Sequence, residues 1–289
     1  MAQLQGYTLV NKDSIFVFEK FHILNTKLIN WKGDFVDIQP ISFNAVENYS
    51  VINHLSNTGG ITYFDNNNLY FTTFSLLNHR NSDSYNPSVK FEYKYDLIQD
   101  SLWVLPFTYP ESYWGKTQNQ FASNPYRDKG KGLEFIYSWP KEPYLIKYNP
   151  TTGGISIHQA HDSRIDPLIP ENMTHRNTTI EEMQVALEHS FYMRIIYDKF
   201  RDIYYRIAFL PIQFDKRVHL DYSSNYERPF AVLVLNSELE PIALKIFKEK
   251  IYNPYSAFAG SEGLYFAKNN PNYNNLDENT LEFTIFELQ

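Results

Sequence analysis

The chain of 289 residues contains no cysteine, which excludes disulfide bonds, thiolate metal sites and cysteine nucleophiles. No apolar stretch approaches the roughly 20 residues that a membrane-spanning helix needs. The sequence also lacks a GxSxG elbow, an HExxH helix, a phosphate-binding loop and a dinucleotide fingerprint. These absences weaken the case for an enzyme without excluding one, because the loop carboxylates Glu111, Asp162 and Asp221 can converge in the fold.

Basic stripes are absent as well. The formal net charge is -7, and lysines and arginines are scattered singly along the chain, so no surface that neutralises nucleic-acid phosphates is expected. Aromatic residues, in contrast, make up 17% of the chain, and flat rings pack well on the pleated surface of a sheet. We therefore expect strands throughout and no nucleic-acid partner.

A sequence pattern typical of a β-hairpin occurs four times. An apolar strand ends in Asn or Asp, five turn residues follow, and apolar residues recur six and eight positions after the Asn or Asp. The four copies are centred on Asn30, Asp96, Asn149 and Asn236, with the apolar pairs Val36 and Ile38, Leu102 and Val104, Ile155 and Ile157, and Ile242 and Leu244. Repetition of a unit too small to bury its own face, at blade-sized spacing, predicts a β-propeller.

An aromatic strand precedes each hairpin, and a fifth copy of that strand lies near the C-terminus. The strands are expected within 12–20, 66–74, 131–139, 201–209 and 261–269. The chain is therefore predicted to be a single all-β propeller domain over residues 1–289, built of four-stranded antiparallel blades at about 7–41, 60–107, 118–159, 189–247 and 255–289.

Two blades are unusual in this prediction. The inner strand of the third blade is expected in the poorly patterned segment near 118–123, and the fifth blade has no outer strand of its own. Residues 2–5 would have to close the ring, or the chain is a fragment of a six- or seven-bladed ring, which we favour because 2–5 is short and not very apolar. Unpaired strand edges invite association.

One short helix is expected after Asn177, in an insertion between the third and fourth blades, with Thr178 or Thr179 as the N-cap. The long connections are expected on one side of the blades, and binding sites favour such loops on a rigid scaffold. These connections are 42–59, 75–88, 108–118, 158–188 and 212–229.

Two groups of loop residues are the candidate ligand contacts. Tyr109, Tyr113 and Trp114 form an aromatic group, and His158, His161, Asp162 and Arg164 form a polar one; together they suit a sugar ring or a peptide. The alternative for the aromatics is that they roof the core. The histidines with His175 or His189 have a metal-ligand spacing, but hydrogen-bonded or solvated histidines are the favoured interpretation, so no metal and no cofactor is predicted.

The segments EGLYFAKNNPNYNNLDENTLEFTIFEL, KYDLIQDSLWVLPFTYP and VLNSELEPIALKIF resemble the domain of unknown function 4221 family, TolB-like β-propeller lipoproteins of Bacteroidota. The resemblance implies a protein of the cell envelope, in the periplasm or at the outer-membrane surface, attached to a membrane only through a lipid anchor that is absent from this chain. It implies no functional residue, since the family has no agreed activity.

The function predicted is that of a non-catalytic, ligand- or partner-binding β-propeller of the bacterial cell envelope, which binds an unknown glycan, peptide or protein through its long-loop face. Two alternatives stay open: a carbohydrate-active enzyme, like the five-bladed glycoside hydrolases, and a structural subunit of a surface assembly.

Overall fold

The computed structural model describes residues 4–19, 23, 25–41, 50–53, 60–75, 79–166, 168–170, 178–219, 222–274, 276–277 and 279–287. The chain forms two compact units. The first comprises residues 1–116 together with 149–154, and the second comprises 117–148 together with 155–289. Each unit is described by itself.

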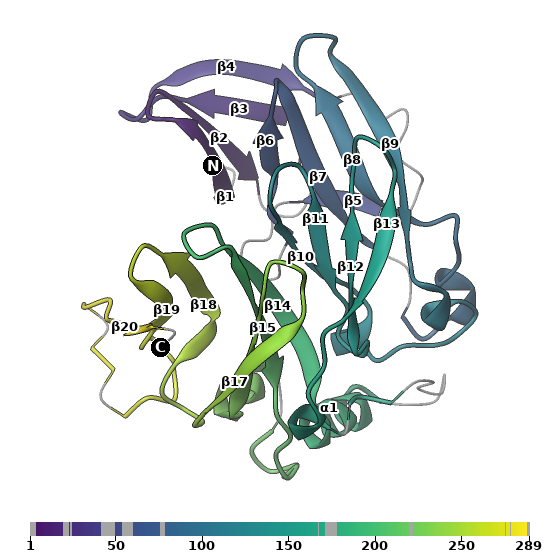
Figure 1. Ribbon diagram of the computed structural model, residues 1–289, viewed down its shortest axis with the longest axis vertical. Coiled ribbons are helices and arrows are strands. Elements are labelled where there is room, and N and C mark those ends of the chain that lie inside the picture. Colours follow the sequence, from purple (N-terminus) through teal and green to yellow (C-terminus); the bar gives the residue numbers. More distant parts are fainter. Residues whose placement is uncertain are drawn as a thin grey trace. The chain divides into compact units, whose positions relative to one another are not determined.

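The first unit contains two antiparallel sheets (Figure 1). One has the order β1-β2-β3-β4, with strands β1 (Leu4–Asn11), β2 (Ser14–Glu19), β3 (Asn25–Ile29) and β4 (Phe35–Pro40). The other has the order β5-β7-β8-β9, with β6 also paired to β7; its strands are β5 (Ser50–Asn53), β6 (Tyr63–Asp65), β7 (Asn68–Ser75), β8 (Lys90–Asp96) and β9 (Ser101–Thr108). Two 3-10 turns follow the strands of this sheet, η1 (Ser82–Ser84) and η2 (Glu111–Tyr113).

The second unit contains three antiparallel sheets, each in sequence order. The first holds β10 (Tyr126–Lys129), β11 (Phe135–Ser138), β12 (Tyr144–Tyr148) and β13 (Ile155–Gln159). The second holds β14 (Phe191–Asp198), β15 (Ile203–Phe209), β16 (Phe230–Leu235) and β17 (Pro241–Phe247). The third holds β18 (Asn253–Gly260), β19 (Gly263–Ala267) and β20 (Phe283–Phe286). Outside the sheets lie the helix α1 (Thr179–Glu188) and the 3-10 segments η3 (Gln120–Ala122), η4 (Ser163–Ile165) and η5 (Tyr222–Glu227).

The predicted fold class is confirmed: the protein is an all-β propeller of antiparallel blades with one α-helix among the described residues. All five predicted aromatic strands are present, as β2, β7, β11, β15 and β19. The fifth sheet has three strands among the described residues, and there β20 pairs with β19 alone. The inner strand of the second blade is divided between β5 and β6, which pair with successive parts of the same edge of β7.

The predicted inner strand of the third blade is wrong. Residues 120–122 form η3, because the side chain of Asn119 accepts a hydrogen bond from the Phe121 amide and caps a 3-10 turn. The strand that pairs with β11 is β10, a few residues later. It carries polar residues on its buried side, Arg127 among them, so it has no apolar pattern from which it can be recognised.

The four repeated hairpins share one turn chemistry. The side-chain oxygens of Asn30, Asp96, Asn149 and Asn236 each accept hydrogen bonds from main-chain amides two to four residues later. Such Asx turns fix the start of the loop. One residue near the end of each loop has a positive φ, and in two of the loops it is glycine, at Gly33 and Gly153, which adopts that conformation without steric cost.

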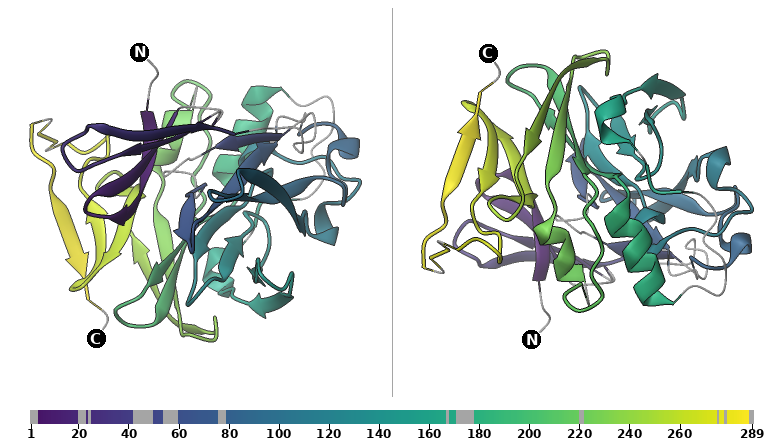
Figure 2. Two further views of the ribbon diagram at one scale, coloured as in Figure 1. Left: turned by 90° about the horizontal axis from the view of Figure 1, so that it is seen from above. Right: turned by 90° about the horizontal axis from the view of Figure 1, so that it is seen from below.

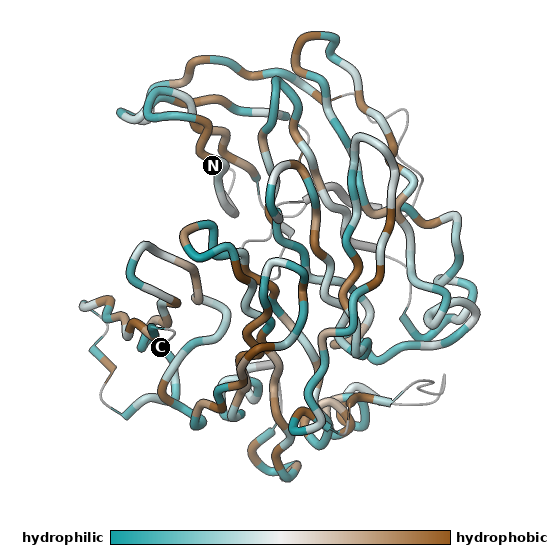
Figure 3. Tube along the Cα trace, in the orientation of Figure 1, coloured by the Kyte–Doolittle hydropathy of each residue, from teal (hydrophilic) through white to brown (hydrophobic). Residues whose placement is uncertain are grey.

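The core of the second unit is centred on β15 and β16. Every residue of both strands is buried, and Figure 3 shows hydrophobic residues concentrated along β14 and β15. The outer strands differ. Six of the eight apolar residues that define the repeat are exposed there, with fractional exposures of 57% for Val36, 63% for Ile157 and 51% for Ile242, whereas Leu102 and Leu244 are half-buried against the core. The repeat therefore identifies the strands correctly, but several of its apolar positions lie outside the core.

Neighbouring inner strands of the second unit are tied together through side chains. The carboxylate of Asp128 on β10 accepts a hydrogen bond from the Tyr197 amide of β14 at 2.8 Å. The guanidinium of Arg194 on β14 donates to the carbonyls of Tyr255 and Ala257 on β18. Each blade is thus held to the next by a charge-assisted bond to the main chain, a stronger bond than a neutral one.

A second buried arginine joins the third and fourth blades. Arg206 of β15 is fully buried. Its guanidinium lies 3.3 Å from the centroid of the Tyr192 ring and donates to the Ser138 hydroxyl and to main-chain carbonyls of Trp139, Glu142, Tyr144 and Ala160. The loop between β11 and β12 and the residue after β13 are thereby fixed to the fourth blade.

Replacing Arg206 with Met should lower the free energy of unfolding by about 3 kcal/mol, because several buried carbonyls lose their donor. Urea denaturation followed by circular dichroism measures the change. The control substitution Lys245→Met, at an exposed residue of β17, should leave the midpoint in place. Equal effects of the two substitutions would contradict the role given to Arg206.

Candidate functional site

The described parts of the long connections in the second unit meet at one end of its blades. Figure 2 shows α1 and η5 at the same end of the sheets when the protein is seen from below. The hydrogen bonds agree: the Ile212 amide donates to the carbonyl of Leu187 at the end of α1, and the side chain of Asn119 donates to the carbonyl of Glu182 within the helix. The loop before β10, the helix and the loop after β15 therefore form one surface, which we call the loop face.

Helix α1 begins at a complete capping box. The Thr178 hydroxyl accepts from the Glu181 amide, and the Glu181 carboxylate accepts from the Thr178 amide. This confirms the predicted helix and selects Thr178 of the two predicted caps. Glu181 and Glu182 lie in the first turn, where the positive end of the helix dipole favours them. The cap defines where the helix starts and so which of its residues reach the loop face.

A third buried arginine fixes the helix to the strands. Arg228, just before β16, donates to the carbonyls of Leu210, Ala186 and His189, and its guanidinium lies over the rings of Phe191 and Phe209. Burial lowers the pKa of Arg228 to about 9. No carboxylate pairs with it among the described residues, so main-chain dipoles and aromatic faces replace the counter-ion.

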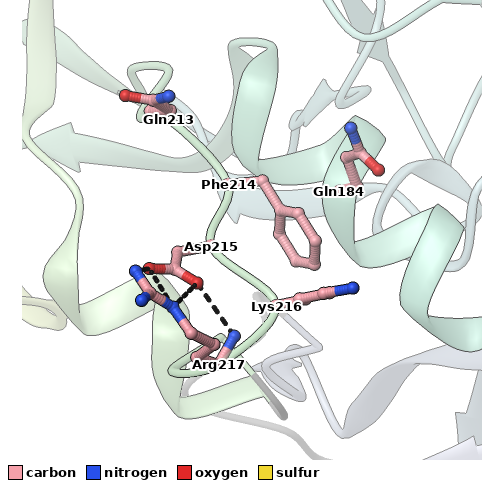
Figure 4. A pocket seen from close by; sticks show the side chains of 6 residues that line it. All are labelled: Gln184, Gln213, Phe214, Asp215, Lys216 and Arg217. Carbon is pink, nitrogen blue, oxygen red and sulfur yellow. Dashed lines mark hydrogen bonds and ion pairs between the residues drawn. The ribbon is translucent and has the colours of Figure 1, made fainter.

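A pocket of about 600 Å³ opens between α1 and the loop that follows β15 (Figure 4). Its lining residues are Gln184 from the helix and Gln213, Phe214, Asp215, Lys216 and Arg217 from the loop. The volume lies within the range of small-ligand sites, about 300 to 1,000 Å³. Both of its walls are anchored by Arg228, since that side chain bonds the carbonyl before the loop and the carbonyls at the end of the helix.

The loop wall is closed on itself. The amides of Val218 and His219 donate to the Asp215 carbonyl, and the Asp215 amide donates to Nδ1 of His219 at 2.8 Å. The carboxylate of Asp215 accepts from the main-chain amide and the guanidinium of Arg217. These bonds to Arg217 lower the pKa of Asp215. The turn is thus specified by local hydrogen bonds, and its side chains have fixed starting directions.

The polar group predicted from the sequence is divided. His161, Asp162 and Arg164 lie together around η4, where Asp162 is the N-cap and accepts from the amide and the guanidinium of Arg164. Nδ1 of His161 lies 2.7 Å from the hydroxyl of Tyr192, and its Nε2 lies 3.2 Å from the carboxylate of Asp166.

The remaining histidines have local partners. His158 lies on β13, where its Nε2 is 2.9 Å from the Ser156 hydroxyl of the same strand. Nδ1 of His189, at the end of α1, lies 2.9 Å from the Val185 carbonyl. Within the described ranges no group of three or more His, Asp or Glu side chains is arranged to hold a metal ion. His175, named in the metal alternative, and Asp221, one of the loop carboxylates, lie outside those ranges.

The aromatic group belongs to the first unit, and it is mostly core. Tyr109 and Tyr113 are 2% and 0% exposed, and their rings pack on each other and on Tyr85. Trp114 is 37% exposed, and its indole nitrogen donates to the Tyr109 carbonyl. The two tyrosine rings are too buried for a ligand to reach, which leaves Trp114 as the accessible residue of the group.

The pocket residues were not singled out from the sequence. The loop 212–229 and the helix were both predicted, but they are more than twenty residues apart, and no pattern in either indicates that they form one cavity. The one available signal was local: Phe214, an isolated aromatic residue in a polar loop, is the kind of side chain that a binding loop presents.

Comparison with known proteins places the fold. No protein-family model and no curated protein matches the chain. Among solved structures, the chain is similar to a member of the duf4221 family from Bacteroides vulgatus, with 21% identity over 96% of this chain and 75% of that one and a TM-score of 0.80. The resemblance that the sequence indicates is thus confirmed at the level of the fold.

Two weaker similarities are to an auxiliary nutrient binding protein from Bacteroides thetaiotaomicron and to an ulvan lyase of polysaccharide lyase family PL25. The nutrient binding protein is 8% identical, and the match covers 93% of this chain and 53% of that protein. The lyase is 10% identical, and the match covers 96% of this chain and 65% of the lyase. Both have a TM-score of 0.45. At these scores neither supports a function for this chain. Within the described part of the chain, no helix has the length and apolarity to cross a bilayer.

We expect Arg228→Met to loosen the loop face. Amide hydrogen exchange should accelerate in α1 and in residues 211–219, because both segments lose the donor that joins them, while β12 serves as an internal reference. Exchange that stays unchanged in the two segments, or that rises equally in β12, would show that Arg228 does not fix the pocket walls.

The carboxyl of Asp162 provides a pH test. The hydrogen bond from the Arg164 side chain lowers its pKa to about 2, from about 3.9 in an unfolded chain. Because the folded pKa is depressed, the stabilising contribution is complete above pH 4 and is lost as the pH falls toward 2. Carbon-13 NMR of the carboxyl should give a midpoint near 2, rising toward 3.9 in Arg164→Gln; a midpoint near 3.9 in the unchanged protein would refute the ion pair.

Proposed function

We propose that this chain is a non-catalytic β-propeller of the bacterial cell envelope that binds a ligand or partner, a glycan, peptide or protein, through its loop face. The observation that carries the proposal is the pocket between α1 and residues 213–217. It is concave and polar with one aromatic ring, and it lies on segments that buried bonds hold in place, as expected for a preorganised binding site.

Rigidity is the reason for assigning binding to this pocket. A loop that must order itself on binding loses affinity to conformational entropy, whereas a preordered loop does not. Arg228 fixes both walls from within the core, and the capping box fixes the start of the helix that carries Gln184. The pocket is therefore built before a ligand arrives.

Among the residues predicted from the sequence, we propose His158, His161, Asp162 and Arg164 as contacts of a larger partner at the second unit. Arg164 is exposed, and the ring of His161 is partly so. Trp114 is the corresponding contact of the first unit; its indole nitrogen is held by the Tyr109 carbonyl, and Tyr109 and Tyr113 are buried. The location in the cell envelope rests on the family resemblance.

The enzyme alternative requires a pair of carboxylates free to act as acid and base. Asp162 is engaged by Arg164, and Asp128 on the inner strand β10 accepts the Tyr197 amide. Both carboxylates already accept hydrogen bonds that hold the fold together. Neither is therefore free to act as an acid or a base, and these bonds favour binding over hydrolysis.

Glycan and peptide arrays probed with the intact chain test the proposal. Binding should be lost in Phe214→Ala, which removes the only aromatic side chain among the residues that line the pocket. Trp114→Ala tests the first unit separately. Phe200→Ala is the control, because it removes an accessible phenylalanine ring, 53% exposed, from the turn between β14 and β15. Identical array profiles for all four proteins would exclude both surfaces as binding sites.

A further inference from the structure

One positive charge in the pocket is left uncompensated. Three lining residues carry charge, and two of them neutralise each other, since both carboxylate oxygens of Asp215 accept from the Arg217 guanidinium. Lys216 forms no hydrogen bond or ion pair with any residue in the described ranges, and its side chain is exposed. An acidic protein of net charge -7 thus presents a single free ammonium group at the rim of its pocket.

The ring of Phe214 is positioned beside that ammonium. Figure 4 shows the ring directed toward α1, with the Lys216 side chain on one side of it and Gln184 on the other. The ring is half-buried, and its contact with the His219 ring at 5.8 Å between centroids supports it from behind. An aromatic face carries partial negative charge and accepts the polarised C–H groups on the apolar face of a saturated ligand ring.

Two side-chain amides complete the set. Nε2 of Gln184 donates to the carboxylate of Glu188, so the amide is held with its oxygen available as an acceptor. Gln213 forms no hydrogen bond with the described residues and offers both a donor and an acceptor. Paired donors and acceptors at a pocket rim match hydroxyl groups, each of which both donates and accepts.

We infer that this pocket binds an acidic saccharide: a sugar ring lies on Phe214, its hydroxyls bond Gln184 and Gln213, and its carboxylate pairs with Lys216. The inference rests on the proposed function and names the ligand class of the same site. An extended acidic peptide is disfavoured, because peptides commonly bind by adding a strand to a sheet edge, and all the lining residues lie in a helix or a loop.

Isothermal titration calorimetry with the full chain tests the inference. The probes are an oligogalacturonate, the same oligosaccharide as its methyl ester, and a Glu-rich peptide of equal charge. The acid should bind about tenfold more tightly than the ester, because the ester loses the charge-assisted bond to Lys216. The difference should shrink as salt is raised, since the ammonium is exposed.

Two variants make the test specific. Lys216→Gln should abolish the preference for the acid over the ester, because the acid loses its charge-assisted bond. Lys245→Gln, an equal change of charge at an exposed lysine of β17, should keep the preference. Thermal melts of both variants check that each is folded.

Equal affinities for acid and ester would overturn the inference, as would tighter binding of the peptide or no binding of either saccharide. The proposed function fails by a different result, array profiles that are identical for the intact chain, Phe214→Ala and Trp114→Ala. If array ligands are found that depend on Phe214 but not on a carboxylate, binding by the loop face stands and the acidic saccharide is wrong.

Discussion

The bonds of a buried guanidinium to main-chain carbonyls are the interaction on which the second unit depends. Burying a charge is costly unless hydrogen bonds compensate it. Arg228 meets this requirement with three carbonyls and two aromatic rings, and the burial still lowers its pKa. Because main-chain carbonyls at the end of α1 and after β15, rather than a carboxylate, supply the compensation, the cation cannot be buried unless those segments take one conformation. The buried charge of Arg228 thereby determines the conformation of the segments around it.

Arg206 of β15 likewise fixes connections of the third blade, because its guanidinium bonds carbonyls in the loop between β11 and β12 and at Ala160 after β13. Arg194 and Asp128 act on the inner strands. A propeller blade repeats its strands but not its connections, so the strands alone leave the connections undefined. In this protein single charged side chains in the strands or next to them fix the connections, and the pocket at α1 is a consequence of that arrangement.

The features that could be predicted from the sequence are those that local residues determine. The hairpin turns follow from Asn30, Asn149 and their equivalents, whose side chains bond amides within four residues, and the helix start follows from Thr178. Strand β10 was not predicted, because the charges of Arg127 and Asp128 are compensated by groups on other strands, the Phe135 ring and the Tyr197 amide. The pocket and the burial of Tyr109 and Tyr113 likewise depend on tertiary packing, which spacing in the sequence does not encode.

The repeated apolar positions show why periodicity specifies a strand without specifying the core. On β13 the exposed residues are Ile155 and Ile157, whereas Ser156 and His158 are the half-buried ones. The alternation is the reverse of the usual pattern, in which apolar residues face inward. An outer strand has one unpaired edge, and apolar residues along it favour association. The hydrogen bond between Ser156 and His158 satisfies the polar side chains that face inward, and the net negative charge opposes edge-to-edge contact between copies.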